Sequence, residues 1–412
     1  MRISTSMLYD VNVTALSQQQ AKLIQTQQQV SAGRRIMTPA DDPAGAALSL
    51  HVAQADALNS QYGSNIDRAQ TSLSLSEGIL QTVTTLLQDV RTTAVNAGST
   101  MVFSNTDRKA IANDLQGRLD ELVSLANTTD ATGSYLFSGF QGKVQPFANT
   151  PAGMQYMGDD GQRMIQVSHA GQVEISGSGA DIFMRIKNGN GTFVAKGPEA
   201  PAIPNTGSGV ASVGSVTNPT LLTGHDYQID FTVLAGVTTY SVTDNSTLPA
   251  PTVLSAGNPY VSGQAISFDG MQFDIQGVPA NGDLFTVKPS TSESVFETIS
   301  NLINALNTPV VTGNVASFAQ FSADIGRALN GMDRSLDNVL SVRSSMGSRL
   351  RGLDSEKNTT EDLGIQYRQV LSQLQDLDYN KAISDLNQQQ TTLEAAQKSF
   401  KLVSGMSMFD YM

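Results

Sequence analysis

The chain has 412 residues, a formal net charge of −12, and neither cysteine nor tryptophan. Its length exceeds what one hydrophobic core usually fills, so two or three domains are expected. The absence of cysteine excludes disulfides, cysteine-ligated zinc and thiol catalysis. The acidic balance argues against nucleic acid as a partner, because phosphate binding needs clustered lysine and arginine side chains.

No secretory or membrane-crossing segment is predicted. Residues 1–7 contain no apolar core of signal-peptide length and no small-residue cleavage pattern. No uncharged apolar run approaches the roughly 18 residues that cross a bilayer. If the chain is exported, we expect a route that leaves no cleaved peptide.

The first predicted element is an amphipathic helix. Its stripe alternates spacings of four and three, which is typical of a helix that packs against another helix. The stripe consists of Tyr9, Val13, Leu16, Gln20, Leu23, Gln27 and Val30. After it, Gly33 predicts a helix end, and Asp42 followed by Pro43 predicts a helix start. The boundary motif between the two helices consists of Gly33, Pro39, Asp41, Asp42, Pro43 and Gly45.

Two further helices are predicted before residue 140. The longer one has a seam from Tyr62 to Ala97 in which Ser76 is the polar member. The shorter one has an apolar face from Ile111 to Leu125.

The composition changes between residues 140 and 289, which contain 20 of the 35 glycines and 11 of the 14 prolines. Long helices are therefore not expected there. Short alternating runs at residues 163–167, 227–233 and 265–268 predict an antiparallel β domain. A loop at residues 199–219, rich in Pro, Gly, Ser and Thr, is expected to divide this domain into two sub-units.

Helical patterns return after Pro289. Ser294 and Glu297 form a predicted capping box, and a long seam runs from Ile325 to Leu353 and continues to Leu377. The seam changes face near residues 376–378, because Leu377 and Leu386 are nine residues apart and point to opposite sides of a helix. We interpret this change of face and the break at residues 33–43 as two halves of one domain boundary.

The last predicted helix repeats the pattern of the first. Its stripe consists of Tyr379, Ile383, Leu386, Gln390, Leu393, Gln397 and Phe400. The two ends of the chain are predicted to lie side by side. Glutamines inside the seams would fix the register and lower the stability of an isolated pair. We therefore expect fast hydrogen exchange at residues 1–30 and 378–412 of the free monomer.

The predicted fold class is mainly α with an inserted β domain. Long antiparallel helices from both chain ends would form a coiled-coil-like rod, with the Gly/Pro-rich antiparallel β domain at the far end. Three domains are predicted: a terminal helical assembly domain (1–42 plus 378–412), a helical rod domain (43–139 plus 290–377) and the inserted β domain (140–289).

No residue pattern predicts catalysis, a cofactor or a bound metal. His51, His169 and His225 are isolated in the sequence, and none belongs to a zinc-protease motif. The adjacent carboxylates Asp41 and Asp42, and Asp159 and Asp160, are better explained by helix capping and a turn than by acid-base chemistry. Phosphate-binding loops and nucleophile elbows are also missing. The chain is predicted not to be an enzyme.

The sequence resembles a known family at both ends. The segments MRIST (1–5), SAGRRI (31–36), PADDPAG (39–45) and GSYLFSG (133–139), and the endings at 382–390 and 405–412, are similar to the bacterial flagellar hook-filament junction proteins called hook-associated protein 3. The resemblance covers roughly the first 140 and last 120 residues. The pattern S-x-G-x-R-I followed by D-D-x-A-G is shared with flagellins. Pro39, Pro43, the Tyr-Leu-Phe-Ser-Gly turn at 135–139 and the Phe409-Asp410-Tyr411 ending favour the junction family.

The resemblance implies a structural role. It implies a ring between hook-associated protein 1 and the flagellin filament, and export through the flagellar type III apparatus with a cytosolic chaperone, directed by an uncleaved N-terminus. The protein would be secreted and part of the extracellular flagellum. We expect both stripes, with Met406, Met408 and Phe409, to form the assembly interface.

Two alternatives remain open. The chain would be a flagellin if it polymerised alone into long filaments. It would be a secreted β-domain adhesin or enzyme on a flagellin-like stem if deletion of residues 140–289 abolished its function.

Overall fold

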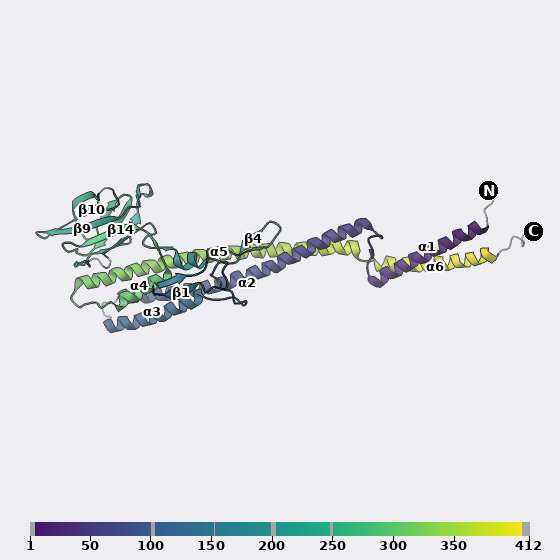
Figure 1. Cartoon of the computed structure of the whole chain (residues 1–412), viewed down its shortest axis with the longest axis horizontal. Coiled ribbons are helices and arrows are strands. Elements are labelled where there is room, and N and C mark those ends of the chain that lie inside the picture. Colours follow the sequence, from purple (N-terminus) through teal and green to yellow (C-terminus); the bar gives the residue numbers. More distant parts are fainter. Residues whose placement is uncertain (1–4, 100–103, 152, 199–202, 248–249, 406–412) are drawn as a thin grey trace, which may run out of the picture. The chain divides into compact units, whose positions relative to one another are not determined.

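The protein is mainly helical with an inserted antiparallel β region, as predicted (Figure 1). The structure, a computed structural model, describes residues 5–99, 104–151, 153–198, 203–247 and 250–405. Its helices are α1 (Thr5–Ala32), α2 (Pro43–Ser99), α3 (Asn105–Ala126), α4 (Val295–Asn307), α5 (Val315–Gln375) and α6 (Tyr379–Gly405). The chain forms two compact units, one of residues 1–66, 167–169 and 354–412 and the other of residues 67–166 and 170–353.

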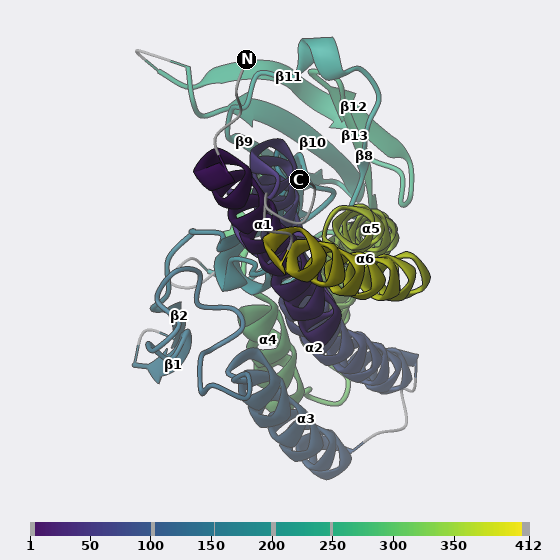
Figure 2. The ribbon, with the colours of Figure 1, turned by 90° about the vertical axis from the view of Figure 1, so that its right-hand side faces the viewer.

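In the first unit, α1 and α6 run side by side in opposite directions (Figures 1 and 2). The rings of Tyr9 and Phe400 pack at one end of this pair, with their centroids 5.3 Å apart. In the same unit, the first part of α2 packs on the last part of α5, where the buried Asn59 donates its amide to the carbonyl oxygen of Thr360 at 2.7 Å. The prediction that the two chain ends pair is confirmed.

In the second unit, α2 and α5 bury the seams that their sequences predict. The buried side chains of α2 include Leu73, Leu80, Val83, Leu87 and Val90, and those of α5 include Ile325, Met332, Val339 and Met346. The polar member Ser76 is also buried, and its hydroxyl donates to the carbonyl of Ser72 at 3.0 Å. An ion pair between Arg343 and Glu77 at 2.8 Å joins the two helices.

The part of the chain formed by the described residues of 127–166 and 170–187 packs on the helices of this unit. An aromatic cluster of Phe137, Phe147, Phe183 and Phe296 connects it to α4, with ring centroids 5.2 to 6.0 Å apart. Its elements are β1 (Phe147–Thr150), β2 (Gly153–Tyr156), β3 (Met164–Gln166), β4 (Gln172–Glu174), a π-helical turn η1 (Ala180–Met184) and β5 (Ile186–Lys187). This part of the chain therefore shares its core with the helices.

Two antiparallel sheets form the rest of the β region. One has the order β11-β10-β9-β14-β6, and the other has the order β12-β13-β7, with β8 also paired to β13. Their strands are β6 (Phe193–Lys196), β7 (Val210–Ala211), β8 (Ser215–Val216), β9 (Tyr227–Leu234), β10 (Val237–Asp244), β11 (Thr252–Pro259), β12 (Ala265–Phe268), β13 (Met271–Gln276) and β14 (Leu284–Pro289). A short 3-10 turn η2 (Pro219–Leu221) precedes β9, and β15 (Ser292–Glu293) pairs with β5.

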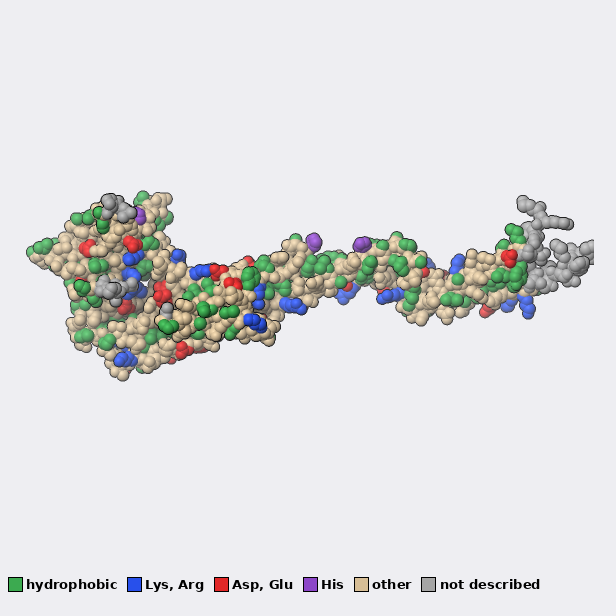
Figure 3. Space-filling model, viewed as in Figure 1, with side chains coloured by type: hydrophobic (Ala, Val, Ile, Leu, Met, Phe, Trp, Pro, Cys, Tyr) green, Lys and Arg blue, Asp and Glu red, His purple; other side chains and the backbone are tan. Residues whose placement is uncertain are grey.

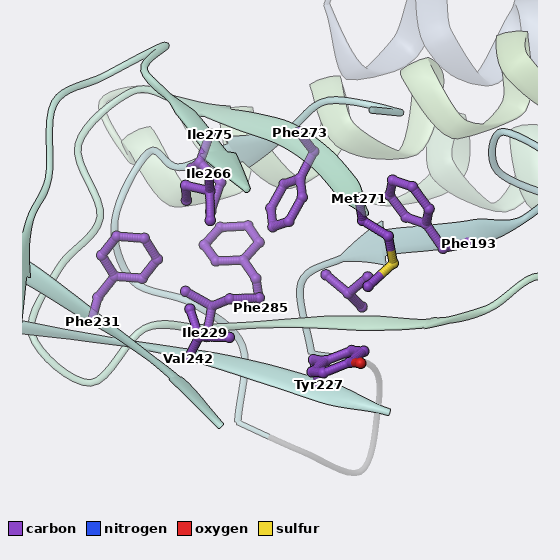
Figure 4. Packing of buried hydrophobic residues seen from close by; sticks show 11 residues of the cluster. Phe193, Tyr227, Ile229, Phe231, Val242, Ile266, Met271, Phe273, Ile275 and Phe285 are labelled. Atoms are coloured by element: carbon purple, nitrogen blue, oxygen red, sulfur yellow. The ribbon is translucent and has the colours of Figure 1, made fainter. Parts of the chain in front are cut away.

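The core of these sheets is a cluster of aromatic and aliphatic side chains (Figure 4). Strand β9 alternates buried and less buried positions, so Tyr227, Ile229 and Phe231 all point into the cluster. The predicted strands at 163–167, 227–233 and 265–268 are confirmed by β3, β9 and β12. The chain enters and leaves this part at adjacent points, because the amide of Asn188 donates to the carbonyl of Thr291 at 3.1 Å.

Candidate assembly surface of the terminal helices

The boundary motif between α1 and α2 consists of two helix caps, as predicted. Gly33 has a φ of +69° and donates its amide to the carbonyl of Gln29 at 2.9 Å, which ends α1. Asp42 accepts the amide of Gly45 at 2.9 Å, and Pro43 is the first residue of α2. Gly45 is buried against Asp42, and a side chain there would collide with the Asp42 carboxylate.

Asp41 holds the turn between these caps. Its carboxylate accepts the amides of Thr38 at 2.8 Å and Met37 at 3.0 Å, and the side-chain amide of Gln25 at 2.8 Å. These bonds, with the Thr38 backbone bond the largest contribution, lower the pKa of Asp41 below its ordinary value. Pro39 is exposed in the same turn. The Asp41 carboxylate thus holds the turn before α2, whereas the predicted helix-capping role is filled by Asp42.

The two helix breaks hydrogen-bond to each other. The amide of Arg35 donates to the carbonyl of Gln375 at 2.7 Å, and the amide of Leu377 donates to the carbonyl of Gly33 at 3.1 Å. The guanidinium of Arg35 adds a bond to the carbonyl of Leu374 at 2.9 Å. The compact units divide inside α2 and α5, whereas the predicted division falls at these breaks. The three-domain division stays a prediction.

The stripe predicted on each terminal helix separates into two stripes. Leu16, Leu23 and Val30 of α1, and Leu386, Leu393 and Phe400 of α6, are half-buried in the contact between the helices. Tyr9, Val13, Tyr379 and Ile383 keep 53, 38, 50 and 48% of their surface exposed. We use the name packed stripe for the first six residues together with six neighbours that face the same contact, which are Asn12, Gln19, Thr26, Ala382, Gln389 and Ala396. The outer stripe is Val13, Gln20 and Gln27 on α1, and Ile383, Gln390 and Gln397 on α6. Tyr9 and Tyr379 are partly exposed and also pack within the pair, on the Phe400 ring and beside Gly33.

The prediction that the four glutamines lie inside the α1–α6 seam is wrong. Gln20, Gln27, Gln390 and Gln397 are all exposed. The packed stripe instead includes positions that the sequence analysis passed over, namely Asn12, Gln19 and Thr26 on α1 and Ala382, Gln389 and Ala396 on α6. In a pair of helices, each helix buries only one side of the other. The spacing of four and three does not show which residues of a broad stripe, or which residues beside it, the partner helix buries.

One side-chain oxygen of the packed stripe has no hydrogen-bond partner among the described residues. The side-chain oxygen of Gln389 is buried and accepts no hydrogen bond from the part of the chain that the structure describes. A buried acceptor without a donor costs free energy, so this position lowers the stability of the α1–α6 pair. Met406, Met408 and Phe409, which we expected in the same interface, lie outside the described residues.

The surface of the pair is nearly neutral along α1. Lys22 is the one charged residue between Val11 and Gly33. Figure 3 shows hydrophobic side chains reaching the surface of the terminal helices among few charged ones. Exposed apolar side chains on a helix with little charge are typical of a surface that is covered in an assembly.

The other candidate sites are structural in the described residues. Asp159 accepts the amides of Phe140 and Gly161, each at 2.8 Å, and Asp160 pairs with Arg185 at 2.6 Å. His225 contacts the buried Asp244 at 2.7 Å. Within the described ranges, no three metal-ligating side chains gather at one place, and no helix is long and apolar enough to cross a bilayer.

Two protein families match parts of the chain. Residues 3–142 match the bacterial flagellin N-terminal helical region, which here includes α1, α2 and α3. Residues 202–289 match the D2-like domain of flagellar hook-associated protein 1, which here includes the strands from β7 to β14. The N-terminal helices and the inserted sheets therefore both have counterparts in flagellar proteins.

Whole proteins with the same arrangement are also known. Flagellar hook-associated protein 3 of Salmonella typhimurium is 29% identical over 409 residues, which are 99% of each chain. The crystal structure of flagellar hook-associated protein 3 from Legionella pneumophila is 32% identical, with a TM-score of 0.73 over 78% of this chain and 98% of that one. A structure of the flagellar junction protein FlgL from Legionella pneumophila is 31% identical, with a TM-score of 0.70 over 80% of this chain and all of that one. The chain belongs to the family of flagellar hook-associated protein 3.

Proposed function

We propose that this chain is a structural protein of the bacterial flagellum that joins hook-associated protein 1 at the hook to the flagellin filament. It does so by assembling into a ring through its terminal helices. The observation that carries the proposal is the similarity to flagellar hook-associated protein 3 along 99% of both chains. Head-to-tail contacts between copies generate rings or helical assemblies, which suits a part placed between two tubular parts.

The same reasoning gives its partners and its route. Its partners are hook-associated protein 1 on one side, flagellin on the other and neighbouring copies within the ring. A cytosolic chaperone and the flagellar type III apparatus export the chain, and it works as a secreted, extracellular part of the flagellum. These partners follow from the family and not from a bound molecule.

The flagellin alternative is weaker. The flagellin-type match is confined to residues 3–142, whereas the hook-associated protein 3 relative matches the inserted β region as well. A protein that fills a single layer also needs surfaces for two different neighbours. The purified chain should therefore not polymerise into long filaments at concentrations at which a flagellin does.

Deletion of residues 399–412 tests the proposed function. This change removes Phe400, whose ring packs on Tyr9, together with the end of α6. Cells that carry the deletion should form hooks and release unpolymerised flagellin into the medium, because the filament has no base to grow from. The measurement is electron microscopy of the cells with quantification of flagellin in the medium, with full-length protein as the control. Normal filaments on the deletion strain would contradict the proposal.

A further inference from the structure

The part of the α2–α5 pair that belongs to the first unit has a core of small and polar residues. It comprises residues 43–65 of α2 and 354–375 of α5, and we call it the small-residue segment. In the second unit the same helices bury leucine, isoleucine, valine and methionine side chains. The small-residue segment therefore buries less apolar area, and the hydrophobic effect stabilises it less. Its buried residues are Gly45, Ser49, Asn59, Thr360 and Gly364.

Asn59 places a side-chain amide against the backbone of α5. Asn59 is 8% exposed, and its side-chain nitrogen donates to the carbonyl oxygen of Thr360, which is 9% exposed, at 2.7 Å. In an α-helix the carbonyl of residue 360 also accepts the backbone amide of residue 364. One turn later, the Nε of Arg368 donates to the carbonyl oxygen of Gly364 at 3.0 Å. Two successive carbonyls along one line of α5 thus have a side-chain donor in addition to their helical one.

Glycines lie at the same level in both helices. A Cβ atom at Gly364 would be 3.3 Å from the side-chain nitrogen of Asn59, and one at Gly63 would be 3.6 Å from the Thr360 methyl carbon. Gly364 therefore leaves room for the Asn59 amide to reach the α5 backbone. Glycine also has the most conformational freedom to lose in a helix, so it lowers the stability of α5 at this level.

We infer that α5 has a built-in bend point at residues 360–368, where the helical hydrogen bonds of residues 364 and 368 open while both of their carbonyl acceptors keep a side-chain donor. Opening a helical bond in a buried place usually leaves a carbonyl without a partner, which costs free energy. Here Asn59 and Arg368 stay bonded to the two carbonyls. Helix kinks occur where a side chain enters the hydrogen-bond ladder in this way. The α2–α5 pair can therefore bend at this level while both helices stay intact on either side.

The bend point belongs to the free chain and does not depend on the proposed function. It also differs from fraying of a helix end, because α5 continues beyond it to Gln375. If Asn59 were only a stabilising contact, its hydrogen bond would hold α5 closed. The bend point and the stabilising contact therefore predict opposite effects when Asn59 is replaced.

Hydrogen exchange of the full-length chain, resolved to single amides, tests the bend point. We expect the amides of residues 364–368 to exchange about tenfold faster, relative to their intrinsic rates, than those of residues 356–360 and 370–374 on either side. Such a local maximum indicates opening inside the helix. A steady increase of exchange toward Gln375, or equal protection along the whole stretch, would overturn the inference.

Asn59→Leu separates the bend point from a stabilising contact. Leucine packs well at a buried position of a helix pair, and it cannot donate to the Thr360 carbonyl. Exchange at residues 364–368 should slow about fivefold, because opening the helix then leaves that carbonyl without a partner. Faster or unchanged exchange at these amides would mean that Asn59 only stabilises the closed helix.

Arg368→Met provides a second variant outside the core. Arg368 is exposed and methionine has a similar helix propensity, so this chain should fold even if the Asn59→Leu chain does not. Exchange of the amide of residue 368 should slow about threefold, because the Gly364 carbonyl loses its second donor. Arg351→Met is the matched control, since Arg351 is exposed on α5 and its side chain makes no hydrogen bond to the described residues. It should leave exchange at residue 351 unchanged. Equal slowing in both variants, or no slowing in Arg368→Met, would overturn the inference.

Discussion

At the scale of single residues, two side-chain choices shape the turn between α1 and α2. Gly33 takes a backbone conformation that other residues adopt only with strain, and it leaves room for the hydroxyl of Tyr379. Asp41 accepts three hydrogen bonds and holds the turn closed. Both could be predicted from the sequence as parts of a helix break. The contact of Tyr379 with Gly33 could not, because it joins residues far apart in the chain.

Gly33→Ala should destabilise the first unit by about 1–2 kcal/mol, because an alanine at positive φ is strained and its methyl group would meet the Tyr379 hydroxyl. The measurement is hydrogen exchange of the α1 and α6 amides. Gly63→Ala in α2 is the matched control, since its methyl group would make an ordinary contact with Thr360. The control should be neutral or stabilising by about 0.5–1 kcal/mol. Equal effects of both changes would contradict the role of Gly33.

Asp41 should make the stability of the first unit depend on pH. Its pKa is lowered in the folded chain, so its contribution is complete above the ordinary aspartate pKa of about 3.9 and is lost as the pH falls through the lowered value. Asp41→Asn should therefore show a smaller loss of stability on acidification than the unchanged chain. Thermal unfolding at a series of pH values measures the difference. Identical pH profiles for the two proteins would show that Asp41 contributes nothing.

At the scale of elements, helices α1 and α6 and their pairing could be predicted from the sequence. The separation of the packed stripe from the outer stripe could not, because both follow the same spacing. Leucines and glutamines at spacings of four and three mark a helix that meets other helices. They do not show which neighbour each position meets. In the chain, Leu16 and Leu23 pack while Gln20 and Gln27 point away. The number of helices that pack around α1 or α6 is set by assembly. The sequence of one chain indicates it only through the shared pattern of the two terminal helices.

Leu23→Ala should weaken the α1–α6 pair, and Ile24→Ala should not. Leu23 is half-buried in the packed stripe, whereas Ile24 beside it keeps 54% of its surface exposed. Removing a half-buried leucine side chain should cost about 1–2 kcal/mol, less than in a complete core. Hydrogen exchange of α1 and α6 in the free chain provides the comparison. A larger effect of Ile24→Ala would mean that the packed stripe is assigned to the wrong side of α1.

At the scale of the whole molecule, the nested order of helices around an inserted β region was predictable from glycine and proline content. The extent of the insertion was not. Residues 140–187 have the composition of the β region, yet Phe147 and Phe183 share a core with Phe296 of α4. Such long-range aromatic contacts leave no local pattern. We place the part of the insertion that does not share the helical core between Asn188 and Thr291. These two residues hydrogen-bond to each other where the chain enters and leaves this part.

Deletion of residues 189–290, with a two-glycine link between Asn188 and Thr291, should leave the helices folded and motility largely intact. The ends to be joined already hydrogen-bond, so a short link adds little strain. Circular dichroism and a motility assay measure the outcome. Deletion of residues 140–289 is the comparison, and it should be more damaging because it removes two rings of the aromatic cluster. Loss of function with the shorter deletion and an intact helical fold would favour the adhesin alternative.

Assembly completes the packing of the terminal helices α1 and α6. Their contact within one chain consists mostly of half-buried side chains, with Thr26 and Ala382 buried. It includes the side-chain oxygen of Gln389, which has no hydrogen-bond partner among the described residues. Hydrogen exchange of residues 5–30 and 379–405, measured in the free chain and in isolated flagella, tests this most directly. We predict fast exchange in the free chain and strong protection in the assembled flagellum. Equal protection of these residues before and after assembly would contradict the claim.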